Sequence, residues 1–271
     1  MNSNDFIQLT DQELRDFSLF VKSRYGIDLS KKKQLIESRM QKVFTERKIK
    51  NFTDYFNLIK KSDQNEVTVM LNKLTTNHTY FMREAKHYEF MKEFIMPQWE
   101  KNNRDRNLRI WSAGCSTGEE AYTTVMVLKD YFAFQNWDYR LLATDISAKA
   151  LESAQKAVYH KDALSGIPPS WARKYFVRND DNYFALSDDI RKEVIFRRLN
   201  LMEPFSFAKP FDLIFCRNVM IYFDQPTKNM LTKKFYDVLK PGGFLFIGHS
   251  ETIQHGIAEF NYIKPSIYQK G

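Results

Sequence analysis

A glycine-flanked turn near the middle of the chain leads directly into two carboxylates. Gly114 and Gly118 flank the turn, and Glu119 and Glu120 begin the helical pattern that follows it. Glycines between a strand and a helix let a ligand approach the backbone closely. Two carboxylates at a helix N-terminus repel a phosphate, and the Lys-Ser/Thr pair of a P-loop is missing. The turn therefore favours a cationic or hydroxyl-rich ligand; the alternative is that both glutamates only complement the helix dipole.

An acid also ends the next apolar run along the chain. Asp145 follows Leu141-Leu-Ala-Thr, and an acid at the carboxyl end of such a strand can accept hydrogen bonds from ribose hydroxyls. S-adenosylmethionine carries a sulfonium, an ammonium and a ribose, so it suits both this acid and the glutamates. Asp145 can instead cap a helix that begins near Ser147, and the two roles can coexist.

Polar residues follow a third, strongly apolar run, Phe211–Cys216. Ligands of open α/β sheets bind outside the carboxyl ends of the parallel strands. We therefore expect Arg217, Asn218 and Tyr222 to face the same site. An exposed loop is the alternative for Arg217 and Asn218.

The elements that must position these residues alternate between short β-type runs and helical patterns, which predicts a Rossmann-like α/β domain with a mostly parallel sheet over 108–271. Strands are expected at 108–112, 139–144, 193–197, 211–216 and 243–248, and helices near 118–133, 147–157 and 226–240.

The stretch 158–192 interrupts this alternation. It contains Pro168-Pro169, a short helical run over 171–176 and a turn-rich segment over 179–182. We expect an inserted small β-subdomain between the second and third strands.

Residues 1–76 have a different texture, with one glycine, Gly26, and no proline. Their apolar residues recur at helical spacing, which predicts an all-α N-terminal domain, joined to the sheet domain by a linker and connecting helix over 77–107. Thr10 and Glu13 form a capping-box pattern, and Ser30 is expected to cap the next helix.

That next helix is strongly basic. Residues 31–50 carry a net charge of +6 within a chain of formal charge +8. An apolar stripe is expected on one side (Ile36, Met40, Val43 and Phe44), with Lys31, Arg39 and Lys42 together on its flank. Such a flank suits docking to an acidic partner, and an ordinary solvated helix face is the alternative. The overall charge alone is also compatible with nucleic acid or an acidic membrane surface.

Composition narrows the classes further. Hydrophobic residues make up 43% and charged residues 27%, which argues against disorder. No signal peptide or membrane span is expected, and two cysteines cannot form a disulfide framework, so a reducing cytoplasm fits best. The five histidines show no metal-ligand spacing, so no metal is expected.

Five segments together resemble, in chain order, the chemotaxis receptor methyltransferase (CheR) family. They are Thr75–Glu84 (TTNHTYFMRE), Gly114–Glu120 (GCSTGEE), Ala143–Ile146 (ATDI), Phe215–Phe223 (FCRNVMIYF) and Gly248–Glu251 (GHSE). His78 and Tyr80 lie between matched positions, and Met82 stands where the family usually has an aromatic residue.

This resemblance implies an S-adenosylmethionine-dependent methyltransferase that esterifies glutamate side chains of receptor cytoplasmic domains. The implied cofactor contacts are Asn77, Thr79, Arg83, Glu120, Asp145, Asn200, Leu201, Arg217 and Asn218. Tyr222 is implied to lie near the transferred methyl and, with Arg83, to serve catalysis. Arg83 suits the carboxylate of the cofactor, with a surface ion pair as its alternative.

A glutamate nucleophile needs no general base, because its reference pKa of about 4.3 leaves it ionised at neutral pH. We expect a monomer that binds receptor, without nucleic acid and without membrane insertion. A nucleic-acid methyltransferase is disfavoured because Cys216–Met220 lacks the Pro-Pro pair typical of base-amine enzymes, and a non-catalytic cofactor sensor is the other alternative. Members of the resembled family that bind a peptide at the receptor tail carry a longer, glycine-rich loop in the insertion. Here the segment 177–184 is short and lacks glycine, so the resemblance implies recognition independent of a receptor tail.

Overall fold

The computed structural model describes residues 6–61, 64–75, 77–133 and 135–271. The chain divides into two compact units, which are described separately. The first comprises Met1–Thr76 together with Tyr222–Thr227, and the second comprises Asn77–Ile221 together with Lys228–Gly271. The first unit therefore takes in a short segment from late in the chain.

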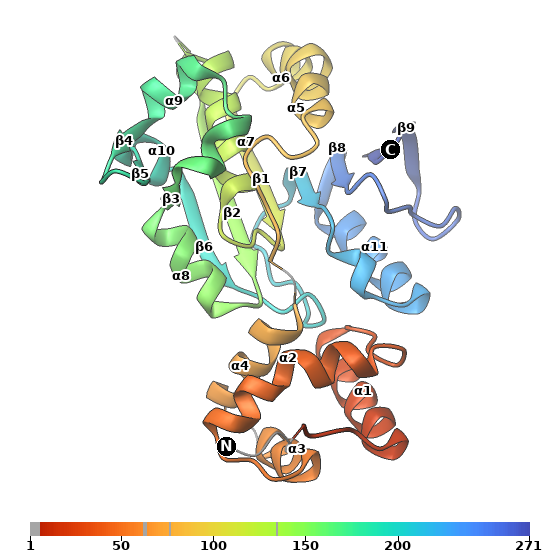
Figure 1. The fold of residues 1–271 in the computed structure, drawn as a ribbon. Coiled ribbons are helices and arrows are strands. Elements are labelled where there is room, and N and C mark those ends of the chain that lie inside the picture. The colour runs from red at the N-terminus through yellow and green to blue at the C-terminus, as the bar shows by residue number, and fades with distance from the viewer. Residues whose placement is uncertain (1–5, 62–63, 76, 134) are drawn as a thin grey trace. The chain divides into compact units, whose positions relative to one another are not determined.

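The first unit contains the helices α1 (Asp11–Tyr25), α2 (Lys33–Glu46), α3 (Phe52–Lys60) and α4 (Gln64–Leu74) (Figure 1). The predicted capping box is confirmed: Glu13 N donates to the Thr10 hydroxyl, and Thr10 N donates to the Glu13 carboxylate at 2.8 Å. The predicted cap at Ser30 is wrong. Asp28 accepts from both the amide and the hydroxyl of Ser30, and this local turn delays the helix until Lys33.

The predicted apolar stripe of α2 is confirmed, because all four of its residues are at most 1% exposed (Ile36, Met40, Val43 and Phe44). Edge-to-face aromatic contacts fill the centre of this unit, as between Phe17 and Phe52 at 5.0 Å between ring centroids. Burial of this kind, rather than intrinsic helix propensity, supplies most of the stability of such short helices.

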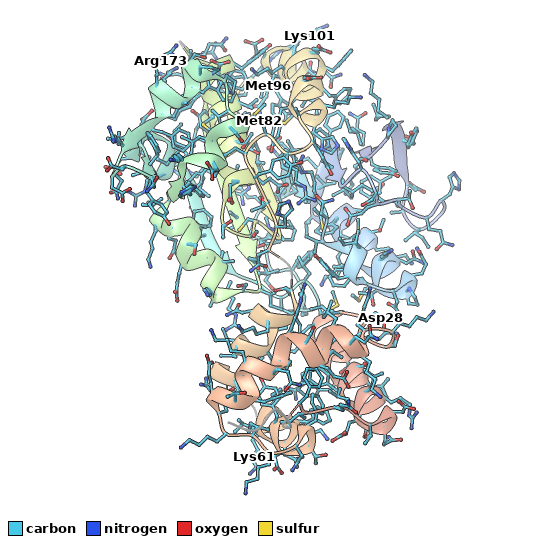
Figure 2. The ribbon with its side chains drawn as sticks, in the orientation of Figure 1. Asp28, Lys61, Met82, Met96, Lys101 and Arg173 are labelled. Carbon is cyan, nitrogen blue, oxygen red and sulfur yellow. The ribbon has the colours of Figure 1, made fainter. Side chains whose placement is uncertain are left out.

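The second unit begins with a nearly continuous helical segment made of α5 (Lys86–Phe90), a π-helical turn (Met91–Ile95) and α6 (Met96–Asn102). Met96 belongs to the hydrophobic core of this unit, and Met82 packs against that core from the segment before α5 (Figure 2). The connecting helix is thus part of the sheet domain's own core.

A seven-stranded sheet forms the centre of the second unit, in the order β6-β2-β1-β7-β8-β10-β9 (Figure 1). Its strands are β1 (Asn107–Ala113), β2 (Asp138–Asp145), β6 (Val194–Arg198), β7 (Phe211–Cys216), β8 (Leu239–Ile247), β9 (Phe260–Lys264) and β10 (Ile267–Lys270). The first five pair in parallel, which confirms the predicted mostly parallel sheet.

Helices α7 (Glu119–Tyr131), α8 (Ala148–Lys156) and α11 (Gln225–Val238) match the predicted helices. Both α7 and α8 pack on β2 and β6. No described helix is long and apolar enough to cross a membrane.

The C-terminal strands β9 and β10 were not anticipated. β10 pairs in antiparallel fashion with β8 on one side and with β9 on the other. β9 is exposed or half-exposed along its whole length, so it lacks the apolar run that marks a buried strand. β8 also starts earlier than expected. The Lys-Pro-Gly-Gly stretch lies within β8, where the register against β7 shifts.

The predicted β-subdomain is confirmed in the insertion. A three-stranded antiparallel sheet of β3 (Val158–His160), β5 (Tyr183–Leu186) and β4 (Phe176–Arg178) forms there, accompanied by α9 (Pro169–Tyr175) and the single turn α10 (Asp188–Arg191).

Candidate functional site

The polar residues predicted from three separate runs come to one edge of the sheet. Ser112 of β1 lies between Ala143 of β2 and Phe215 of β7. The loops that follow these strands therefore start side by side at their carboxyl ends, where ligands of such sheets bind. This position brings together the glycine turn, Asp145 and the segment that begins at Arg217.

The glycine turn requires its glycines for close packing. Gly114 and Gly118 have φ angles of +89° and +97°. A Cβ on Gly114 would lie 2.4 Å from the Val219 side chain, and one on Gly118 would lie 3.0 Å from Ala154. At both positions the atoms that a Cβ would meet belong to other side chains of the protein. The turn thereby packs against Val219, in the loop after β7, and against Ala154 of α8, and its first amides donate to the carbonyl of Thr144.

Asp145 links β2 to this turn. Its carboxylate accepts from the amides of Ser116 at 2.8 Å and Ser147 at 2.9 Å. The cap of α8 is Ser147, whose hydroxyl accepts from Ala150, so the capping role considered for Asp145 is not the one it plays. Burial raises the pKa of Asp145 against the effect of these amide bonds. Each of its oxygens still has a lone pair for a ligand hydroxyl.

Arg217 and Glu120 form a buried ion pair. Arg217 Nε donates to Glu120 Oε2 at 2.7 Å, and the Arg217 side chain is only 1% exposed. Glu120 Oε1 accepts from the Ser112 hydroxyl at 2.6 Å, and Arg217 Nη1 donates to the carbonyl of Arg83 at 2.8 Å. Both side chains thus bind each other and neighbouring groups of the protein. Their contact with a cofactor remains a prediction.

Asn218 carries a buried polar atom, Oδ1, that has no hydrogen-bond partner among the described residues. Its Nδ2 lies 3.4 Å from Glu84 Oε1. Its backbone is left-handed, with φ of +59°. Buried acceptors are nearly always hydrogen-bonded in native proteins, so this one is well suited to a donor on a ligand.

Glu251 holds Asn218 in place, a role that was not anticipated. Its carboxylate accepts from the amides of Asn218 at 2.9 Å, Gly248 at 2.6 Å and Ile221 at 3.0 Å. A Cβ on Gly248 would lie 2.6 Å from Asn218 Nδ2. The GHSE motif held this signal: a glycine that permits close approach, followed three residues later by an acid.

Backbone strain gathers in the same segments. Among the described residues, eight other than glycine have positive φ, and four of them belong to the segments that form this site: Met82, Glu84, Ser116 and Asn218. Left-handed backbone at such residues costs about 1 to 3 kcal/mol each and clusters at functional sites. This clustering supports the location of the site independently of the residue types.

The segment before α5 lies against the glycine turn. The Ser116 hydroxyl donates to the carbonyl of Asn77 at 3.0 Å, and Thr79 is half-buried two residues later. Arg83 donates to the carbonyl of His78 at 2.7 Å, and its guanidinium lies 5.7 Å from the Tyr80 ring centroid. The alternative for Arg83, a surface ion pair with Glu84 or a neighbour, is not among the ion pairs of the described residues.

Asn200 and Leu201 follow β6 and approach Asp145 through the backbone. Leu199 N donates to the carbonyl of Asp145 at 3.1 Å, and Asn200 Oδ1 accepts from Met202 N at 3.1 Å. Leu201 is buried. These residues therefore extend the same edge of the sheet beyond β2.

Tyr222 groups with the first unit rather than with the residues above. Its carbonyl accepts from Asp28 N at 2.9 Å, and the next residue, Phe223, forms an antiparallel bridge with Ile27. Its role beside the transferred methyl therefore stays a prediction.

The prediction that Lys31, Arg39 and Lys42 share one flank of a helix is wrong, whereas their role in docking stays a prediction. Lys31 lies in the turn before α2, and Lys42 is exposed with Glu46 at 3.9 Å. Arg39 is half-buried and donates to the carbonyls at the end of α4, including Leu74 at 3.1 Å. Arginine near a helix C-terminus satisfies carbonyls that lack helical partners, and this local use draws Arg39 away from the surface.

Glu84, His87 and His249 are the cluster of metal-ligand types found in the described part of the chain. Arg217 already brings a positive charge there, with Nη1 3.1 Å from His87 Nδ1 and 3.6 Å from Glu84 Oε2. Burial, together with the charge of Arg217, lowers the pKa of His87 to about 3, so its ring is neutral. The guanidinium disfavours a metal ion at this cluster.

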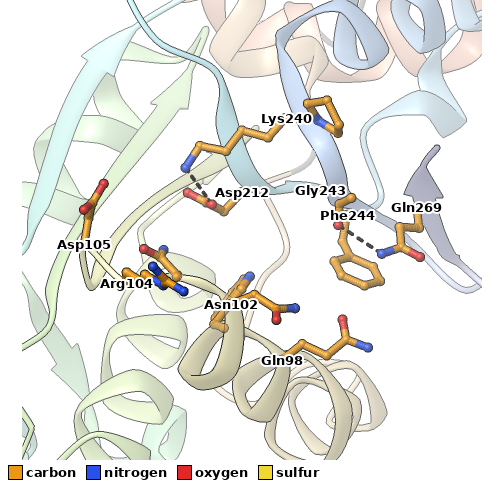
Figure 3. A pocket seen from close by; sticks show the side chains of 13 residues that line it. Gln98, Asn102, Arg104, Asp105, Asp212, Lys240, Gly243, Phe244 and Gln269 are labelled. Atoms are coloured by element: carbon orange, nitrogen blue, oxygen red, sulfur yellow. Dashed lines mark hydrogen bonds and ion pairs between the residues drawn. The ribbon is translucent and has the colours of Figure 1, made fainter.

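A cavity of about 610 Å³ lies at the other edge of the sheet, at the amino ends of β1, β7 and β8 (Figure 3). Lys240 pairs with Asp212 at 2.7 Å inside it, and Gln269 donates to the carbonyl of Gly242. None of the predicted site residues lines this cavity, and these polar groups already bind one another.

Comparisons with known proteins agree with this arrangement. Residues 12–75 match the model of the CheR methyltransferase all-alpha domain, and residues 77–268 match that of the CheR methyltransferase SAM binding domain. A chemotaxis protein methyltransferase of Borreliella burgdorferi is 44% identical over 99% of this chain and 99% of its own length. Counterparts from Escherichia coli and Klebsiella aerogenes are each 33% identical, over 97% and 98% of this chain and 92% and 89% of theirs. The chain therefore belongs to the CheR methyltransferase family, and residues 77–268 form its S-adenosylmethionine-binding domain.

Proposed function

We propose that this protein transfers the methyl group of S-adenosylmethionine to glutamate side chains of chemotaxis receptors, giving glutamate methyl esters. Membership of the CheR family over nearly the whole chain supports the activity. The observation in the structure that carries the proposal is the unpartnered, buried Oδ1 of Asn218, located at the carboxyl edge of the sheet beside the Arg217–Glu120 pair. This acceptor suits an ammonium donor, which the cofactor has.

In the proposed site, Asp145 accepts hydrogen bonds from the ribose hydroxyls, and Asn218 accepts one from the ammonium. Asn77, Thr79, Asn200 and Leu201 complete the walls. Arg83 pairs with the carboxylate of the cofactor. The ion pair of Glu120 and Arg217 holds this edge of the sheet in place, because a buried pair with several hydrogen bonds keeps its geometry.

The proposed reaction needs no general base from the protein. A glutamate oxygen of the receptor forms the new bond to the methyl carbon as the carbon–sulfur bond breaks and its electron pair passes to sulfur. The nucleophile is ionised at neutral pH, so no proton has to be removed. His87 fits this scheme, because it is neutral and accepts from Arg217 rather than acting as a base. The protein contributes approach geometry and a dry site, with Tyr222 and Arg83 as the proposed positioning groups.

The proposed setting is the cytoplasm, where both cysteines stay as buried free thiols. The proposed partner is the receptor cytoplasmic domain, bound by a monomer of this protein through the exposed basic residues of the helical unit.

A transfer assay with methyl-labelled cofactor and receptor-rich membranes tests the proposal. We expect label in the receptor, and we expect mild base to release it as methanol, since esters hydrolyse under conditions that leave N-methyl groups intact. A protein that binds the cofactor yet transfers no label would instead be a sensor. Base-stable label, or label in nucleic acid, would contradict the ester chemistry.

A further inference from the structure

The loop that carries Asn200 and Leu201 is held from behind by one lysine. Lys234 lies on α11, and its Nζ donates to the carbonyls of Leu201 and Glu203, both at 2.6 Å. Two short bonds from one ammonium to carbonyls two residues apart fix the curvature of the chain between them. Such charge-assisted bonds are about twice as strong as neutral ones.

The ammonium is also packed against an aromatic ring. Lys234 Nζ lies 4.0 Å from the ring centroid of Phe205, which itself packs edge to face on Trp111 at 5.0 Å. Partial burial lowers the pKa of Lys234 to about 8, partly opposed by the charge of Glu203. The lysine is therefore partly buried, at a cost to its charged form, and two of its donors bind the carbonyls of the loop.

The other end of the loop is tied to Asp145. Leu199 N donates to the carbonyl of Asp145 at 3.1 Å, and Glu203 N donates to the carbonyl of Asn200 at 3.0 Å. The segment 199–203 is thus a tight turn fixed at one end by β2 and at the other by Lys234. Its shape decides where Asn200 and Leu201 lie.

We propose that Lys234 is a positioning residue that shapes the 199–203 loop for cofactor binding without touching the cofactor itself. The inference rests on the proposed function, because it takes Asn200 and Leu201 as cofactor contacts. Lys234 acts on binding of S-adenosylmethionine and its demethylated product, and not on the receptor.

Calorimetric titration with the demethylated product, S-adenosylhomocysteine, tests this on the full-length protein. Lys234→Met keeps most of the side-chain volume and loses every donor, so we expect affinity to fall about tenfold. Lys234→Arg keeps the charge and should restore most of it. Lys233→Met, an exposed change on the same helix, is the matched control and should bind like the parent. In steady-state kinetics the KM for the cofactor should rise in Lys234→Met, while kcat at saturating cofactor should change little.

A pH series on the parent and Lys234→Arg gives a second test, which does not require Lys234→Met to fold. The charged group that faces Lys234 is Glu203. Between pH 7 and pH 9 the parent should lose affinity relative to Lys234→Arg, because only the lysine loses its charge. A constant ratio across a range in which an NMR titration shows Lys234 losing its proton would overturn the proposal, as would normal affinity in a folded Lys234→Met variant. Failure of the parent itself to bind the ligand would instead remove the proposed function, and this inference with it.

Discussion

The Arg217–Glu120 pair at the sheet edge and the lysines Lys31 and Lys42 of the helical unit are charged residues in opposite surroundings. At the sheet edge, Arg217 and Glu120 are buried, short-bonded and part of the scaffold. In the helical unit, Lys31 and Lys42 are exposed. Removing one partner of a buried pair costs about 3 to 5 kcal/mol, whereas exposed pairs contribute about 0 to 1 kcal/mol. The comparison teaches that the Arg217–Glu120 pair is part of the scaffold, whereas the exposed Lys31 and Lys42 contribute little to stability.

Arg217→Met should have the largest effect on stability. It leaves Glu120 buried without its cation, so we expect the free energy of unfolding to fall by about 3 to 5 kcal/mol. Urea unfolding measures this change. Lys42→Met is the matched exposed control and should stay within about 0.5 kcal/mol of the parent. Glu120→Gln combined with Arg217→Met should cost less than the sum of the single changes. A loss below 1 kcal/mol in Arg217→Met would mean that the pair is not a scaffold element.

Asp145→Ala tests the contribution of one residue at the same edge of the sheet to cofactor binding. It should weaken binding of S-adenosylmethionine by about 1.5 to 3 kcal/mol through loss of charge-assisted hydrogen bonds. Asp138 lies at the other end of β2, where its exposed carboxylate accepts from Asn107, so Asp138→Ala should bind normally. Calorimetry on folded protein gives both values. Equal affinity of the two variants would remove Asp145 from the site.

Sequence reasoning succeeded where a residue type and a strand end coincide. The strand after which each candidate lies was predictable from apolar runs, so the convergence of Gly114, Asp145 and Asn218 on one edge followed from the parallel sheet. The contacts of Arg39 and Ser30 were not predictable. Arg39 donates to carbonyls at the end of α4, and Ser30 donates to Asp28. For Glu251, the GHSE motif shows the nearby amide of Gly248, but the amides of Asn218 and Ile221 come from a loop about thirty residues earlier, so its role as a clamp was not predictable from the motif alone. The strand β9 has no apolar run to reveal it.

Tyr222→Phe tests the residue whose surroundings differ most from those of the other candidates. If the hydroxyl helps to position the reacting groups, turnover should fall by about three- to tenfold while cofactor affinity holds. Rapid-quench measurement of a single turnover isolates this step from product release. Phe223→Leu is a useful companion, because it alters the adjacent bridge residue and leaves the hydroxyl in place. Equal losses in affinity and turnover for Tyr222→Phe would make the tyrosine a binding residue.

Charge reversal on the helical unit should give the smallest effect, and the structure changes which residues to reverse. Arg39→Glu would disturb the end of α4, because Arg39 donates to its last carbonyls, so a loss of methylation in that variant would not report on docking. Lys31 and Lys42 are exposed, and the Lys42 pair with Glu46 is long at 3.9 Å. Lys31→Glu with Lys42→Glu should therefore lower the rate of receptor methylation several-fold at low salt, with a shallower salt dependence than in the parent. Exposed charges mainly steer encounter and are screened over about 8 Å at physiological salt.

Lys101→Glu with Lys156→Glu is the matched control. It changes the net charge equally, at exposed positions of the other unit, and should leave the rate of methylation closer to that of the parent. Cofactor affinity should be unchanged in both variants. Equal rates for the two double variants would mean that the receptor responds to overall charge, and that the basic stretch of the helical unit is only a solvated face.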